Sequence, residues 1–207
     1  MSELSTRRED ARARRTLITL VVFAVLNHIV FNGSRIAVSL YAVAVGPAKA
    51  YVEKQKLQRC AENLRKLHMS LSLYANEHDG AYPAAAGARD VGEVLSLLVP
   101  KYTADTSLFA CPGAGKSSNA RGDFAYAMGL TKDAGGETLL LSDAQVNADE
   151  KRRGTNIFAG TESGPGSNHG KAGGNVIFCD GHVETIGAIA PRDFALPPGA
   201  RLLNPTR

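Results

Sequence analysis

Four side chains that can bind a metal ion lie within one stretch of the sequence: His169, Asp180, His182 and Glu184. Imidazole nitrogens and carboxylate oxygens are common ligands of divalent cations. However, Asp180-Gly181 separates two strand-forming runs, and Asp-Gly is a frequent two-residue turn of β-hairpins. Because the spacing fits no standard metal-binding loop, we expect a structural hairpin here, with a metal site as the less favoured alternative.

Three cysteines, Cys60, Cys111 and Cys179, form no CxxC pair, so their spacing matches neither a standard zinc site nor a disulfide scaffold. In an exported protein one pair would be oxidised and the third thiol left over. The alternative is three partly buried free thiols. A Cys60–Cys111 bridge would tie a loop to a helix, but the sequence leaves the two states open.

Two short patterns have the residue types of catalytic motifs but lack essential parts. Gly113-Ala-Gly-Lys-Ser-Ser118 contains the end of a phosphate-binding loop, but Ala110 stands where its first glycine is required. Ser142-Asp143 and His169 are residue types of hydrolases, but no nucleophile elbow surrounds Ser142. We therefore expect neither nucleotide binding nor hydrolysis, and we assign no catalytic residue.

Composition narrows the class of protein further. The chain has 207 residues, no Trp, an aromatic content of 6% and a net charge of +4, which allows one modest core. Much of the positive charge comes from arginines between Arg7 and Arg15, directly before an apolar run. A nucleic-acid-binding face would instead mix basic and aromatic residues, so we expect no nucleic-acid partner.

A long amphipathic helix is expected to organise the folded part. Between 53 and 78 the apolar residues recur at alternating steps of three and four, which places them on one helical stripe: Leu57, Cys60, Leu64, Leu67, Leu71 and Tyr74. Asp79-Gly80 is expected to end this helix, and Tyr82-Pro83 prevents it from resuming.

The preceding residues have the pattern of a membrane anchor. Residues 1–15 are predicted to form a basic cytoplasmic tail, and 16–46 a tilted transmembrane helix interrupted at Asn32-Gly-Ser-Arg35. A hairpin insertion is the alternative. A cleaved signal peptide is disfavoured, because the apolar run is too long and no A-x-A site precedes Pro47.

The rest of the chain is predicted to be a head of class α+β, over 47–190, followed by a flexible Pro-rich tail over 191–207. We expect a short helix at 91–98, an extended piece at 107–112, and strands at 124–128, 137–142, 175–179 and 182–186. Five strand residues are expected to cover the helical stripe: Leu139, Leu141, Val176, Phe178 and Val183.

Three segments, in order, carry a family resemblance. They are Cys60-Ala-Glu-Asn63-Leu64 with Asp79-Gly80-Ala-Tyr82-Pro83, then Leu108-Phe-Ala-Cys111-Pro112, then Asn168-His169 with the run from Asn175 through Asp180-Gly181-His182. Together they resemble bacterial type II secretion pseudopilins and prepilin-like proteins. The third segment resembles the processing-associated domain named for a His, nine residues and Asp-Gly, although ten residues lie between His169 and Asp180 here.

This resemblance implies a pilin-like fold, with a long membrane-anchored helix packed on a small antiparallel sheet. It implies a non-enzymatic, single-pass subunit of a bacterial inner-membrane assembly, of the type II secretion or type IV pilus kind, with a periplasmic or extracellular head. The lipid bilayer and other pilin-like subunits would be its partners. The alternative is an anchored periplasmic metal-binding or hydrolytic protein that uses the His169/Asp180 region.

The resemblance also bears on cofactors and on the anchor. Major pseudopilins hold calcium in a comparable loop, where this chain has Asp143, Asp149 and Glu162; we expect no cofactor, with calcium as the alternative. Arg14 and Arg15 occupy the places of the cleavage-site Gly and aromatic residue, and Thr19 that of the Glu. The segment 26–41 instead resembles the first helix of major facilitator transporters, which indicates a replaced or fused anchor.

Overall fold

The structure, a computed structural model, describes residues 2–115, 122–146, 156–161, 166–188, 194 and 196–205, without the side chains of 2–17, 29 and 31–47. The chain divides into two compact units, Met1–Ala50 and Tyr51–Arg207. Helix α1 (Ser2–Asn76) contributes to both units.

The first unit is helical, and its described side chains are largely apolar and exposed. Within the part of the chain that is described, no helix is apolar over a length sufficient to cross a membrane. The expected basic tail at 1–15, and most of the expected membrane helix at 16–46, lie outside the residues whose side chains are described.

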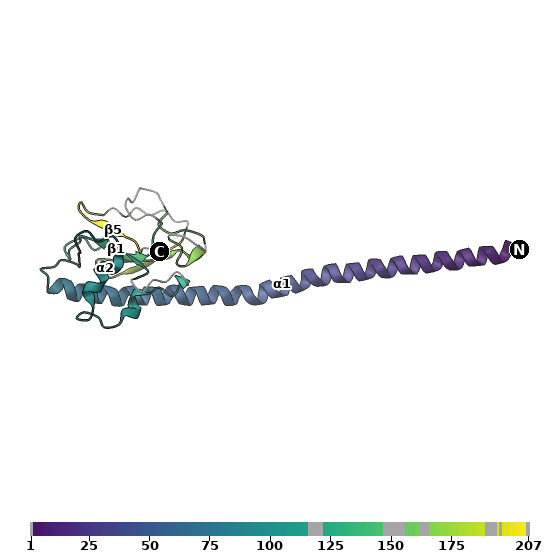
Figure 1. The fold of residues 1–207 in the computed structure, drawn as a ribbon, viewed down its shortest axis with the longest axis horizontal. Helices are drawn as coiled ribbons and strands as arrows, with labels where there is room; N and C mark the ends of the chain where they lie inside the picture. Colours follow the sequence, from purple (N-terminus) through teal and green to yellow (C-terminus); the bar gives the residue numbers. More distant parts are fainter. Residues whose placement is uncertain are drawn as a thin grey trace. The chain divides into compact units, whose positions relative to one another are not determined.

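The second unit contains a five-stranded antiparallel sheet in the order β4-β3-β2-β1-β5, which confirms the α+β class. Its strands are β1 (Phe124–Met128), β2 (Leu139–Asp143), β3 (Gly174–Phe178), β4 (Val183–Ile186) and β5 (Arg201–Leu203). The last part of α1 lies beside this sheet (Figure 1). The four strands expected from the sequence are present: β1 has the expected ends, and the ends of the other three differ by at most two residues.

The stripe of α1 forms the helical half of the core. Cys60, Leu64, Leu67 and Leu71 are fully buried and belong to one apolar cluster with the strand residues. The helix ends where the sequence indicates: the Gly80 amide donates to the Ala75 carbonyl at 2.9 Å. Asp79 and Gly80 both take positive φ there, at 52° and 83°, the left-handed conformation that terminates helices.

The strand register corrects the expected cover of this stripe. Residues paired across antiparallel strands point to the same face of a sheet. Asn175 bonds to the backbone of α1, so its face, which includes Ile177 and Val183, is the α1 face. Val183 therefore lies on the face that was expected, whereas Val176 and Phe178 lie on the other face, so the expectation that these two cover the stripe was wrong. A register shift between Leu139 and Leu141 changes the alternation that the prediction assumed.

The β3–β4 hairpin also differs from the predicted two-residue turn. The Gly181 amide donates to Phe178 at 2.9 Å, and the Phe178 amide donates to His182 at 3.1 Å. These bonds close a three-residue loop, Cys179-Asp180-Gly181, in which only Gly181 has positive φ, at 89°. This is a turn followed by a G1 bulge. Asp-Gly does mark the hairpin, but Asp180 needs no left-handed backbone.

Short helical elements and the strand β5 also belong to the described part of the head. Helix α2 (Val91–Leu95), capped by the Asp90 side chain, continues into η1 (Ser96–Leu98), as expected for 91–98. The segment predicted to be extended at 107–112 begins instead as a helical turn, η2 (Thr106–Phe109), because the Asp105 carboxylate caps it. Residues 201–203, assigned to the flexible tail, form β5 because Leu202 and Leu203 join the core.

Candidate functional site

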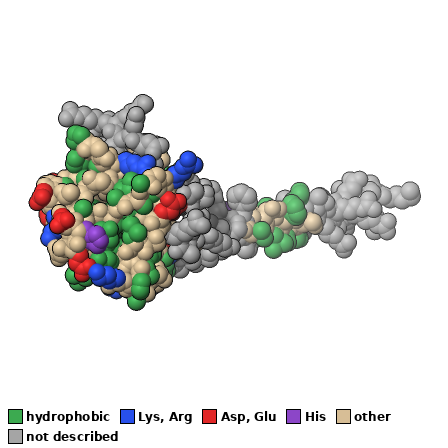
Figure 2. Space-filling view, turned by 60° about the vertical axis from the view of Figure 1, so that its left-hand side comes forward, with side chains coloured by type: hydrophobic (Ala, Val, Ile, Leu, Met, Phe, Trp, Pro, Cys, Tyr) green, Lys and Arg blue, Asp and Glu red, His purple; other side chains and the backbone are tan. Residues whose placement is uncertain are grey.

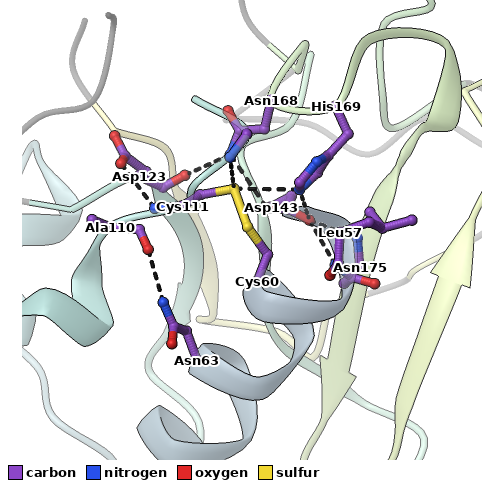
Figure 3. Close-up of a disulfide and its surroundings, with 11 residues drawn as sticks. Leu57, Cys60, Asn63, Ala110, Cys111, Asp123, Asp143, Asn168, His169 and Asn175 are labelled. Atoms are coloured by element: carbon purple, nitrogen blue, oxygen red, sulfur yellow. Dashed lines mark hydrogen bonds and ion pairs between the residues drawn. A yellow bond between two sulfur atoms is a disulfide. The ribbon is translucent and has the colours of Figure 1, made fainter. Parts of the chain in front are cut away.

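A disulfide bond joins α1 to the segment after η2. Cys60 lies on the buried stripe of α1, and Cys111 lies two residues beyond Phe109, the last residue of η2; their Cα atoms are 5.3 Å apart. One helical turn further along α1, the Asn63 side chain donates to the Ala110 carbonyl at 3.0 Å. Figure 3 shows both links. The α1 helix therefore holds the 110–111 backbone through one covalent bond and one hydrogen bond.

His169 lies directly against this disulfide. Its Nε2 atom is 3.3 Å from the Cys111 sulfur and 3.5 Å from Oδ2 of Asp143. The side chains of His169 and Asp143 are both completely buried. His169 immediately precedes η4 (Gly170–Ala172), and Asp143 is the last residue of β2. Four residues from distant parts of the sequence thus meet at one buried point.

Asn175 fixes the Asp143 carboxylate. Oδ2 of Asp143 accepts from the Asn175 amide at 2.8 Å and from its side-chain nitrogen at 3.2 Å. The side-chain nitrogen of Asn175 also donates to the Leu57 carbonyl of α1 at 2.9 Å. The side-chain oxygen of Asn175 accepts from the Thr185 hydroxyl at 2.9 Å. Asn175 thus bonds to α1, β2 and β4.

Asn168 and Asp123 form further hydrogen bonds to Asp143 and Cys111. The Asn168 side chain donates to the Asp123 carbonyl at 3.1 Å and to Oδ1 of Asp143 at 3.3 Å. The Asp123 carboxylate accepts from the Cys111 amide at 3.0 Å. Buried polar groups are costly unless they are bonded, so these contacts stabilise the arrangement. Nδ1 of His169, in contrast, has no hydrogen-bond partner among the described residues.

The two sulfurs of the cluster, bonded to each other, lie beside an imidazole and a carboxylate. One atom each from Cys60, Cys111, Asp143 and His169 lies within 4.8 Å of the others. The Ser142 hydroxyl donates to the Asp143 carbonyl and accepts from Gln145, so it is not aligned for activation by His169.

A second polar group lies at the β3–β4 turn. Glu137, Asp180 and His182 bring their ligand atoms within 4.8 Å of one another. Oδ1 of Asp180 accepts from the His182 amide at 2.9 Å and lies 2.6 Å from its Nδ1. These hydrogen bonds hold the pKa of Asp180 below its ordinary value. They are the bonds expected of a turn carboxylate, and they fit the structural interpretation of Asp180-Gly181.

The four candidate metal ligands of the sequence are divided between these places. His169 is in the buried cluster, whereas Asp180 and His182 belong to the turn and Glu184 to neither described group. Asp149 and Glu162, named with Asp143 as a calcium loop, lie outside the described residues.

The other predicted motif residues have structural positions. Leu64 is in the core, while Asp79, Gly80, Tyr82 and Pro83 form the exit from α1, where the Pro83 carbonyl accepts from the buried Tyr126 hydroxyl at 2.8 Å. Pro112 follows the disulfide and is exposed. The sequence reasoning missed Asp123. The sequence marks Asp123 only as an acidic residue between Gly122 and a predicted strand, and this pattern is too common to indicate a site.

No protein family, no curated protein and no solved structure matches this chain.

Proposed function

We propose that the protein is a non-enzymatic, membrane-anchored, pilin-like structural subunit of an assembly of the type II secretion or type IV pilus kind. The observation that carries this proposal is the apolar exposure of α1 between Ile18 and Val30. Leu20, Val21, Val22 and Phe23 are each at least half exposed. Since successive helical residues are about 100° apart, these four point in different directions around the axis.

A helix that is apolar on all sides needs cover on all sides, either from lipid or from other apolar helices. Figure 2 shows these apolar side chains gathered on the described stretch of the first unit. The second unit differs, because its part of α1 buries one stripe against its own sheet. The two parts of α1 thus have the properties of an assembly segment and of a folded head.

The construction of the head supports a structural role. The disulfide and the bonds from Asn63 and Asn175 fasten α1 to the strands and loops around it. A subunit that is held by its helix in an assembly must transmit force from that helix to its head. Links of this kind suit that task.

The proposal can be tested in membranes that contain the full chain. Val22→Glu places a charge in the apolar segment, and Leu97→Glu, at a residue of the head that is 41% exposed, is the matched control. We expect Leu97→Glu to stay in carbonate-washed membranes like the parent and Val22→Glu to be lost from them. Recovery of the parent protein in the soluble fraction would contradict the anchor.

Assembly is tested separately by oxidative crosslinking. Val25→Cys, in a Cys179→Ser background, adds an exposed thiol to the apolar segment. We expect disulfide-linked dimers between chains, and none with the same background lacking Val25→Cys. Membrane retention without crosslinks would identify an anchored monomer instead of an assembling subunit.

A further inference from the structure

We propose that the buried cluster of Cys60, Cys111, Asp143 and His169 is a zinc site when its disulfide is reduced, so that a metal ion and a disulfide are alternative links between α1 and the 110–111 segment. The proposal concerns the head alone and goes beyond the assembly role proposed above.

The distances fit a tetrahedral ion. Zn–S bonds of about 2.3 Å and Zn–N or Zn–O bonds of about 2.0–2.1 Å place tetrahedral N and S ligands about 3.6 Å apart, and N and O ligands about 3.3 Å apart. Nε2 of His169 is 3.3 Å from the Cys111 sulfur and 3.5 Å from Oδ2 of Asp143. Nε2 of His169 is therefore already at nearly the required distance from two of the other three ligand atoms, and the Cys111 sulfur and the Asp143 oxygen lie within 4.8 Å of each other.

The fourth ligand requires only rotation of cysteine side chains. In a tetrahedral site the two sulfurs would be about 3.8 Å apart. The Cα atoms of Cys60 and Cys111 are 5.3 Å apart and can remain in place while the freed Cys60 side chain rotates and the Cys111 sulfur stays beside His169. Two thiolates, an imidazole and a carboxylate form a set of sulfur, nitrogen and oxygen donors that suits Zn²⁺.

The surroundings orient Asp143 by hydrogen bonds and confine His169 by packing. Asp143 is oriented by two hydrogen bonds from Asn175, and the backbone at Gly113 packs closely against the imidazole of His169. A Cβ atom on Gly113 would lie 2.4 Å from Cε1 of that ring. Such contacts hold ligands in position before an ion arrives.

The chemistry balances with a dithiol as reductant. The dithiol gives two electrons and two protons to the Cys60–Cys111 bond and becomes a disulfide itself. Zn²⁺ then replaces the two thiol protons, which are released to solvent. One divalent cation replaces two protons, so the net charge of the buried cluster does not change.

The test uses the full chain in detergent with Cys179→Ser, which removes the thiol outside the cluster. The protein is unfolded with a phosphine reductant and refolded with or without zinc, and bound zinc is measured after gel filtration. We expect one zinc per reduced chain, none in the oxidised chain, and a higher thermal midpoint for the reduced chain with zinc than with chelator. Cobalt should give the absorption of a thiolate-bound tetrahedral ion.

Two variants locate the ion. Asp143→Asn, which keeps the size of the side chain, should lose stoichiometric zinc, whereas His182→Asn, in the exposed group at the β3–β4 turn, should retain it. Three results would overturn the proposal: no zinc in the reduced chain, whether or not it refolds; equal zinc in oxidised and reduced chains; or loss of zinc in His182→Asn with retention in Asp143→Asn.

Discussion

The disulfide bond should supply much of the stability of the head. We consider the double substitution Cys60→Ala with Cys111→Ala, which removes the bond without leaving a thiol at either position. The cysteines are 51 residues apart in the sequence. Closing a loop of this size lowers the entropy of the unfolded chain by about 14 cal/mol/K, which corresponds to about 4 kcal/mol at 25 °C. Both sulfurs are buried, so lost packing adds to this figure.

A loss of about 4 kcal/mol is a large part of the free energy of unfolding of a domain of this size. It should be measured by urea unfolding of the full chain in detergent, in the presence of chelator, and followed by tyrosine fluorescence because the chain lacks Trp. Cys179→Ala is the control, since Cys179 is a half-buried free thiol; its cost should be about 1 kcal/mol or less. If the double variant loses no more than this control, the loop-closure reasoning is refuted.

Three further predictions concern the helix, the hairpin and the free thiol. Leu64→Asp should cost several kcal/mol because Leu64 is fully buried, whereas Leu73→Asp, at a residue 54% exposed, should change the urea midpoint little; equal midpoints would mean that the stripe is not in the core. Gly181→Val should lower the free energy of unfolding by about 1–3 kcal/mol, because Gly181 has positive φ and an added Cβ would lie 3.0 Å from the His68 ring. Asp180→Asn should leave the free energy of unfolding nearly unchanged, with or without chelator. A large loss of stability in Asp180→Asn, together with destabilisation of the parent by chelator, would show a bound cation there. Burial, with a smaller effect of the Asp180 charge, raises the pKa of Cys179 to about 11. Its alkylation at pH 8 should therefore be at least about tenfold slower than in the unfolded chain and should accelerate up to about pH 11. A rate that levels off near pH 9, the ordinary thiol pKa, would show that the pKa is not raised.

The elements of the head could be predicted because their signals are local. The three-and-four spacing of Leu64, Leu67 and Leu71 depends only on helical geometry, and Asp79-Gly80 needs only its own backbone conformation to end α1. The Asp-Gly pair marked the β3–β4 hairpin for the same reason. Its loop length was misjudged, because a two-residue turn and a three-residue turn with a bulge both accept that pair.

Non-local features could not be read from the sequence. The face on which Val176 and Phe178 lie depends on the register and on the shift between β2 and β3, which are set by strands far apart in the chain. The strand β5 consists of only three residues in a Pro-rich stretch, and it forms because β1 offers an unpaired edge. His169 and Asp143 were both noted as polar candidates, but only the folded head brings them to the disulfide.

The position of β5 has a consequence for synthesis of the protein. Strand β5 is the last of the sheet's strands in the sequence, yet it pairs with β1, the first. Asn204, the first residue after β5, exchanges two hydrogen bonds with Gln145. Until residues 201–204 emerge from the ribosome, β1 remains an uncovered sheet edge. A nascent or truncated head is thus a template for strands of neighbouring molecules, so aggregation should depend sharply on whether the chain has passed residue 204.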